Sequence, residues 1–166
     1  QTMRAIPWVL SVLAVASLGS AMFEAQGLSS VVSQKLIEAV RNGDGKGARA
    51  MLAQGADVNS VQPDGATALH WAAYHDDSDT AAILLKSGAE PNVANDFGAT
   101  PLWLACANGS LELVDQLLAS GADPTAALPK GETILMTASR TGVVGVVKRL
   151  LSRGAEVNAR EDTRGQ

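Results

Sequence analysis

The sequence predicts an all-α repeat solenoid, a stack of helix-turn-helix units with short β-hairpin or turn tips. The first observation is a repeat, because Gly-Ala recurs at positions 55, 88, 121 and 154, a step of 33 residues. The second is composition: 46% of residues are hydrophobic but only 4% are aromatic, which suits closely stacked helices better than a β-sandwich. The third is a content of 16 glycines, which indicates many helix ends and turns.

Five further columns of residues share the same period. They are Leu52, Leu85, Leu118 and Leu151; Gly65, Gly98 and Gly131; Thr67, Thr100 and Thr133; Leu69, Leu102 and Leu135; and Ala72, Ala105 and Ala138. Chance does not align six columns at one step. A fixed period of this length is the signature of an array in which each unit buries its apolar faces against its neighbours.

Each full unit predicts two short helices. A glycine turn precedes a Thr whose hydroxyl can accept a free backbone N–H of the first helical turn, so first helices are expected at 68–74, 101–108 and 134–141. Gly109 and Gly142 should end the last two of them. A second helix follows in each unit; Leu111, Val114 and Leu118, for example, form one apolar stripe.

One unit carries a specific motif in nearly complete form. It contains Gly98-Ala99-Thr100-Pro101-Leu102, Ala105, Gly109, Leu117-Leu118 and Gly121-Ala122-Asp123-Pro124. This pattern resembles the ankyrin repeat, and the resemblance extends from about residue 31 to 166. It implies a hairpin or turn and two antiparallel helices per unit, assembled into an L-shaped stack. Members of the family bind proteins through the hairpin tips and the concave face of the first helices.

The N-terminus has the layout of a secretory signal peptide. Arg4 precedes an apolar run over 6–18, and small residues follow, so that Gly19 and Ala21 fit a signal-peptidase site. Ala25 is a second candidate. The apolar run is shorter than the ~20 residues of a stable membrane anchor, so an uncleaved anchor is the less favoured alternative. We therefore expect an exported protein, periplasmic or secreted, and a bacterial source, because a simple signal leads straight into the repeats.

These features divide the chain into six parts. We expect a signal peptide at 1–25 with cleavage near 21 or 25, an N-terminal capping repeat at 26–59, full repeats at 60–93, 94–126 and 127–159, and the start of a further, truncated repeat at 160–166. The third full repeat would then end in an apolar flank without a cap. Either the sequence is a fragment, or a partner or later repeats cover this flank.

The residues that could carry chemistry have structural interpretations. His70 stands where the ankyrin motif has a histidine, and the resemblance implies that its imidazole bonds across to the next turn. The single cysteine, Cys106, occupies an inward small position, and no neighbouring base suggests a nucleophile. Asp77 or Ser78 can cap a second helix, and the nearby Asp76 stands where the family usually has Gly, so that turn is expected to be tight or strained. No cofactor, metal site or catalytic residue is predicted.

The architecture implied by the resemblance places candidate contact residues at the tips and at the ends of the first helices. The predicted partner-binding residues are Pro63, Asp64, Ala66, Tyr74, His75, Asp96, Phe97, Ala99, Asn108, Lys130, Glu132, Arg140 and Thr141. Phe97 is the strongest single anchor, because an exposed aromatic residue on a tip is otherwise hard to explain. The alternative is that Phe97 packs against a neighbouring hairpin.

The function expected is therefore a non-catalytic protein–protein interaction module or scaffold acting outside the cytoplasm. The alternative is the targeting part of a longer exported protein whose enzymatic domain lies beyond Gln166. The net charge of −4 argues against nucleic acid as a partner. Contact with a membrane is expected only through an uncleaved signal, and the protein should be monomeric unless the uncapped C-terminal flank pairs.

Overall fold

The computed structural model describes residues 27–160. The expected signal peptide with its cleavage positions near 21 and 25 lies outside the described residues, as does 161–166 of the expected truncated repeat. The described helices are, in chain order, a helix at 27–41, α2 (Gly45–Ala53), α3 (Ala68–Tyr74), α4 (Ser78–Lys86), α5 (Pro101–Asn108), α6 (Leu111–Ala119), α7 (Ile134–Thr141) and α8 (Val144–Ser152).

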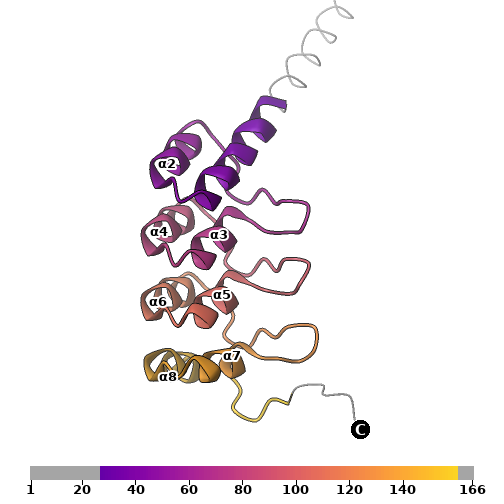
Figure 1. Ribbon diagram of the computed structural model, residues 1–166, viewed down its shortest axis with the longest axis vertical. Coiled ribbons are helices and arrows are strands. Elements are labelled where there is room, and N and C mark those ends of the chain that lie inside the picture. Colours follow the sequence, from indigo (N-terminus) through magenta and orange to yellow (C-terminus); the bar gives the residue numbers. More distant parts are fainter. Residues whose placement is uncertain (1–26, 161–166) are drawn as a thin grey trace, which may run out of the picture.

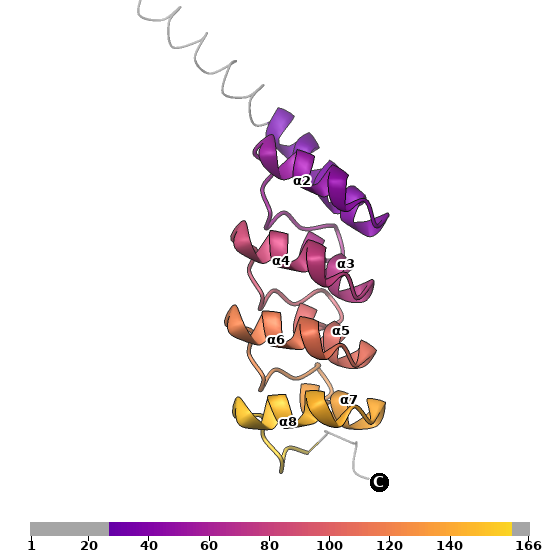
Figure 2. The same ribbon diagram turned by 90° about the vertical axis from the view of Figure 1, so that its left-hand side faces the viewer.

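The helices form two parallel layers in a linear stack. Figures 1 and 2 show α3, α5 and α7 in one layer and α2, α4, α6 and α8 in the other. Within the layers α3 packs on α5, α5 on α7, and α4 on α6. The predicted all-α repeat solenoid and the bounds of the three first helices are confirmed. The expected capping repeat at 26–59 contains the helix at 27–41 and α2.

The predicted signals start and stop the helices. The hydroxyl of Thr100 accepts a hydrogen bond from the Trp103 N–H at 3.2 Å and caps α5. Gly109 ends the same helix in the left-handed conformation, with φ of 71°, where a residue with a Cβ is disfavoured. The same cap recurs at α7 with Thr133 and Gly142. Local sequence and tertiary stacking therefore agree on where these short helices begin and end.

The tips are closed turns rather than extended strand ladders. Isolated bridges join Val61 to Thr67 and Ala127 to Thr133. Within each tip the chain reverses its direction, and all three tip loops project from the same edge of the stack (Figure 1). The angle between these loops and the first helices creates a concave face, defined from here on as the surface between the tips and α3, α5 and α7.

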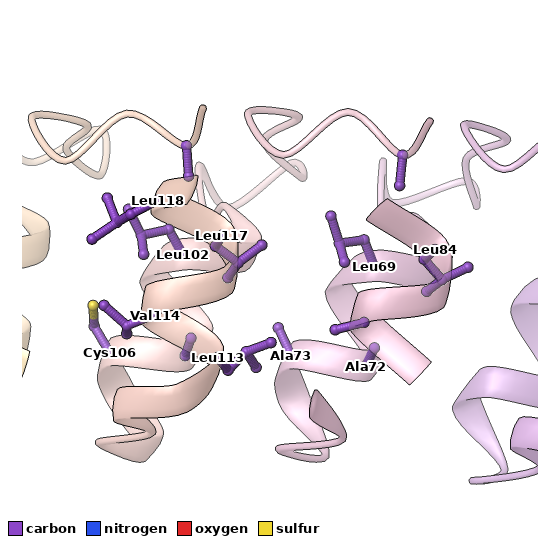
Figure 3. Packing of buried hydrophobic residues seen from close by; sticks show 14 of the residues in the cluster. Leu69, Ala72, Ala73, Leu84, Leu102, Cys106, Leu113, Val114, Leu117 and Leu118 are labelled. Carbon is purple, nitrogen blue, oxygen red and sulfur yellow. The ribbon is translucent and has the colours of Figure 1, made fainter. Parts of the chain in front are cut away.

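The core runs through the stack as rows of equivalent side chains. Figure 3 shows Leu69, Leu102 and Leu117 pointing between the helix layers, and all three are at most 1% exposed. A fully buried Leu contributes roughly 1.5–3 kcal/mol relative to an exposed one. Alanine at 72 and 105 is completely buried as well, which lets neighbouring first helices approach closely.

The C-terminal flank exposes residues whose equivalents are covered inside the stack. Leu118 is 4% exposed whereas Leu151, one repeat later, is 41% exposed. Val58 is 8% exposed and its distant equivalent Val157 is 72% exposed. Leu151 and Val157 line a groove of about 460 Å³ on this flank. The apolar side chains with which one repeat contacts the next are therefore exposed on this flank.

No helix within 27–160 is long and apolar enough to span a bilayer.

Candidate functional site

The apices of the tips present their side chains to solvent. Pro63, Asp64, Asp96 and Lys130 are exposed, and the Phe97 side chain is 74% exposed. The turn holds this residue in place, because the Phe97 N–H donates to Oδ1 of Asn95 at 3.1 Å. Phe97 is therefore not packed against a neighbouring hairpin, and a large apolar ring is available on the surface.

Two predicted contact residues are buried, which corrects their placement on the tip surface. Ala66 and Ala99 are each only 5% exposed. Their carbonyls accept the N–H of Gln62 and Asn95 at 2.8 and 3.0 Å, so each belongs to the arm of the turn that returns to the stack. Their small side chains therefore offer little contact area to a partner.

Glu132 follows the same inward pattern in the third unit. It is half-buried, and its carboxylate accepts from the Thr137 hydroxyl at 2.6 Å and pairs with Arg140. The Arg140 side chain remains largely exposed at 62%. Thr141 is exposed, but its hydroxyl donates to the Ala138 carbonyl at 2.7 Å. Of these three candidates, Arg140 retains the most free surface.

An aromatic cluster occupies the end of α3. Tyr74 is 59% exposed, and its ring meets that of Trp71 edge-on, with centroids 5.8 Å apart. His75 is exposed, lies 6.2 Å from the Trp71 centroid and bonds through Nε2 to the Arg41 carbonyl at 2.8 Å. His75 therefore ties the first full repeat to the capping repeat, while Tyr74 keeps most of its ring free.

Asn108 performs a comparable task at the end of α5. Its side-chain amide donates to the carbonyls of Ala73 and Tyr74 at 3.0 and 3.1 Å. The residue is exposed, but both donated bonds hold neighbouring repeats together. The predicted contact residue thus has a structural role, and its amide N–H groups are engaged.

His70 has the structural role that the family resemblance implied. Its Nδ1 accepts the Thr67 N–H at 3.1 Å, and its Nε2 lies 3.1 Å from the Ala99 carbonyl of the next turn. These contacts fix the tautomer, since Nδ1 must accept and Nε2–H must donate. Burial lowers the pKa of His70 below its ordinary value, although the Ala99 carbonyl and the Asp64 charge act in the opposite direction.

The remaining chemically suggestive residues are also accounted for. Cys106 is completely buried, and burial raises the pKa of its thiol to about 12, so the thiol is not an activated nucleophile. Oδ1 of Asp77 accepts the Thr80 N–H at 2.9 Å and caps α4 as expected. Asp76 adopts a positive φ of 56°, which confirms the strained turn. Among residues 27–160, no three His, Cys, Asp or Glu side chains form a possible metal cluster.

Sequence reasoning missed a pair of asparagine clamps between repeats. Asn59 donates through Nδ2 to the Gly88 carbonyl at 3.0 Å, and its Oδ1 accepts the Glu90 N–H at 2.8 Å. Asn92 makes the same two bonds, to Gly121 and Asp123, at 2.9 and 2.8 Å. Because 59 and 92 differ by the repeat length, the column itself was a usable signal.

A pocket of about 270 Å³ lies on the concave face between the first and second full repeats. Tip residues Asp64 and Asn95 form one side of it, Trp71 and Tyr74 of α3 another, and Leu104 of α5 the third. This pocket brings together three of the predicted contact residues, Asp64, Ala66 and Tyr74. The groove on the C-terminal flank is larger, but its residues are those that stacking covers elsewhere.

Comparison with known families supports the same architecture. A family model described as ankyrin repeats in three copies matches residues 36–128 and again residues 87–161. The two matches together extend over most of the chain, including both helix layers and all three tips. No curated protein was found to match the sequence. The chain belongs to the ankyrin-repeat family.

Proposed function

We propose that the protein is a non-catalytic interaction module that binds another protein through its concave face and tips, outside the cytoplasm. Ankyrin repeats are in general protein–protein interaction modules. The observation that carries the proposal is the exposure of two large aromatic rings, Phe97 at 74% and Tyr74 at 59%. Exposed aromatic anchors beside a groove are typical of interfaces, where a few such residues carry most of the binding energy.

The adjacent surface supports this choice. Asp64 and Lys130 lie at the apices of two tips and Arg140 at the end of α7, all exposed. Charge of both signs around apolar anchors favours a partner of matched polarity. The open C-terminal flank is proposed as a stacking surface instead. The protein is then monomeric unless this flank pairs with a second copy.

The test is capture of partners by wild-type protein and by a variant that combines Phe97→Ala with Tyr74→Ala. Loss of such anchors weakens binding by about 1–2 kcal/mol, or roughly ten-fold. Both side chains are mainly exposed, so unfolding free energy should change by no more than about 1 kcal/mol. Val144→Ala is the control, because Val144 is 63% exposed but lies on α8 in the other layer.

Partners should be captured from periplasmic and culture fractions and quantified by mass spectrometry. Proteins enriched by wild type and by the Val144→Ala variant, but lost with the double variant, support the concave face. Equal capture by all three proteins would refute it.

Export rests on the N-terminal sequence pattern alone. Expression of the full chain followed by cell fractionation should place the protein outside the cytoplasm. Mass spectrometry of the mature protein should then show a new N-terminus at Met22 or Gln26. Recovery of the intact chain from the cytoplasm would contradict the export proposal without affecting the proposed interaction.

A further inference from the structure

The pocket between the first two full repeats combines aromatic, apolar and acidic side chains in its lining. Trp71 and Tyr74 form two nearly perpendicular aromatic walls, with an interplanar angle of 78°. Leu104 supplies an apolar wall and Asp64 a carboxylate at the tip side. Aromatic faces attract cations through their quadrupole, and a carboxylate adds a charge-assisted hydrogen bond.

The pocket is held in shape before any ligand arrives. The indole N–H of Trp71 donates to Oε1 of Gln62 at 2.9 Å, which fixes the ring. Oδ1 of Asp64 accepts the Ala66 N–H at 3.1 Å, which orients the carboxylate. A ligand therefore finds groups that are already ordered, and this reduces the entropic cost of binding.

The ring N–H donors of the pocket are already engaged, and its charge is negative. The Trp71 N–H binds Gln62, and both ring nitrogens of His70 are occupied by Thr67 and Ala99. Asn95 uses Oδ1 to accept the N–H groups of Phe97 and Ala99. Asp64 is the only lining residue of the carboxylate, lysine or arginine type, so the formal charge at the pocket is negative and disfavours an anion. Asp64 has no ion-pair partner in the described part of the chain.

A contact inside the protein illustrates the same preference. The guanidinium carbon of Arg41 lies 6.0 Å from the Trp71 ring centroid. The Trp71 ring thus already has one cation against it, and the more exposed Tyr74 ring is the wall left for a second. A bound cation would lie between Tyr74 and the Asp64 carboxylate.

We propose that this pocket binds a basic side chain, lysine or arginine, of a protein partner. The aliphatic stem would pack on Leu104 and the aromatic walls, while the charged head reaches Asp64. Long basic side chains pair an apolar stem with a charged tip in this way. The inference rests on the proposed function, because it names the chemistry that the interaction face recognises.

The experiment uses small probes with the full chain, followed by NMR. Nα-acetyl-lysine amide, Nα-acetyl-arginine amide and the uncharged Nα-acetyl-norleucine amide are titrated while the Trp71 indole N–H signal is observed. A Trp71→Phe variant assigns that signal. We expect the two cationic probes to bind about five-fold more tightly than the norleucine probe. Equal affinity for the three probes would overturn the proposal.

Matched variants locate the charge. Asp64→Asn removes the charge but keeps an oxygen to accept the Ala66 N–H, so the fold should be preserved and the five-fold preference lost. Asp79→Asn removes an exposed carboxylate in the first turn of α4, which does not line the pocket, and the preference should remain. A preference that survives Asp64→Asn, or that Asp79→Asn reduces equally, would refute the assignment.

The probes require no protein partner, so the outcome of this test is independent of the outcome of the capture experiment. A partner captured through Phe97 by a protein whose pocket shows no preference for cations would overturn the pocket alone. A cation-selective pocket in a protein whose partners ignore Phe97 and Tyr74 would overturn the interaction face alone.

Discussion

Replacing His70 by Met tests whether its imidazole links neighbouring repeats. Position 136, two repeats further on, naturally carries Met in the same column, so the substitution is compatible with a first helix. It removes the bond to the Ala99 carbonyl and leaves the buried Thr67 N–H without its acceptor.

The magnitude follows from these two contacts. A net intramolecular hydrogen bond contributes about 1 kcal/mol, and a buried donor left unsatisfied costs about 1–3 kcal/mol. The apolar Met side chain offsets part of this loss by filling the buried site. We expect a decrease in unfolding free energy of about 2 kcal/mol at pH 7.5, or roughly 7 °C in Tm for a domain of this size.

The same residue makes stability depend on pH. Burial lowers the pKa of His70 in the folded protein, so between the folded and unfolded pKa values the unfolded chain binds more protons. The contribution of His70 to the free energy of unfolding is fully present above the unfolded pKa of about 6.5. It decreases as pH falls below this value, by up to about 1.4 kcal/mol per pH unit. The loss stops growing once pH passes below the folded pKa.

Urea denaturation followed by circular dichroism at pH 7.5 and 5.5 measures both effects. Wild type and a His75→Asn control should lose stability between the two pH values, whereas the His70→Met variant should lose less. The chain has 2 histidines, so the control separates them. An unchanged free energy of unfolding for His70→Met at pH 7.5, or an undiminished pH dependence, would refute the role of the imidazole.

Three further predictions concern the turns, the core and the clamps. Asp76→Gly should stabilise the protein by about 1 kcal/mol in urea denaturation, because Asp76 has a φ of 56° that glycine adopts without strain; a loss of stability would contradict this. Cys106 should resist iodoacetamide in the folded protein and react once urea unfolds it, since the thiol is buried with a pKa near 12; rapid native labelling would show that the core is open. Asn92→Ala should cost about 1–2 kcal/mol, because it breaks two bonds between repeats; a change below about 0.5 kcal/mol would show that water replaces the clamp.

Much of the fold could be predicted because the residues that specify each helix and turn recur in several repeats of the sequence. The Thr and Gly columns mark helix starts and ends by local chemistry, and the observed caps at Thr100, Gly109 and Gly142 follow it. The Leu and Ala columns mark faces that only stacking can bury. A period that repeats local and tertiary signals together leaves little freedom in the arrangement.

The exposure of individual tip residues could not be predicted as well. Ala66 and Ala99 follow the turn glycines and were placed on the surface with the apex, yet both are 5% exposed. The direction of a side chain beside a positive-φ glycine depends on how the returning arm meets the first helix. Two alanines in one column were nevertheless a signal of burial, and half-buried Glu132 continues that column.

The exposure of a residue at the end of the array depends on whether a following repeat covers it. A comparison of equivalent positions in the sequence does not contain this information. Leu118 and Leu151 have the same residue type and register but are 4% and 41% exposed. The difference arises because a following repeat covers the first and none of the described residues covers the second. Position in the stack, rather than local sequence, decides whether such a leucine belongs to the core.

Under the proposed function, recognition comes from positions at which the repeats differ, since the shared columns serve stacking. The apex column reads Asp64, Phe97 and Lys130, which are an acidic, an aromatic and a basic side chain in turn. The column at the end of the first helices reads Tyr74, Ala107 and Arg140. The concave face thus changes from acidic and aromatic at the first full repeat to basic at the third. A partner that places a basic side chain beside Asp64 and an acidic one near Lys130 matches both ends, and it can bind in only one direction along the stack.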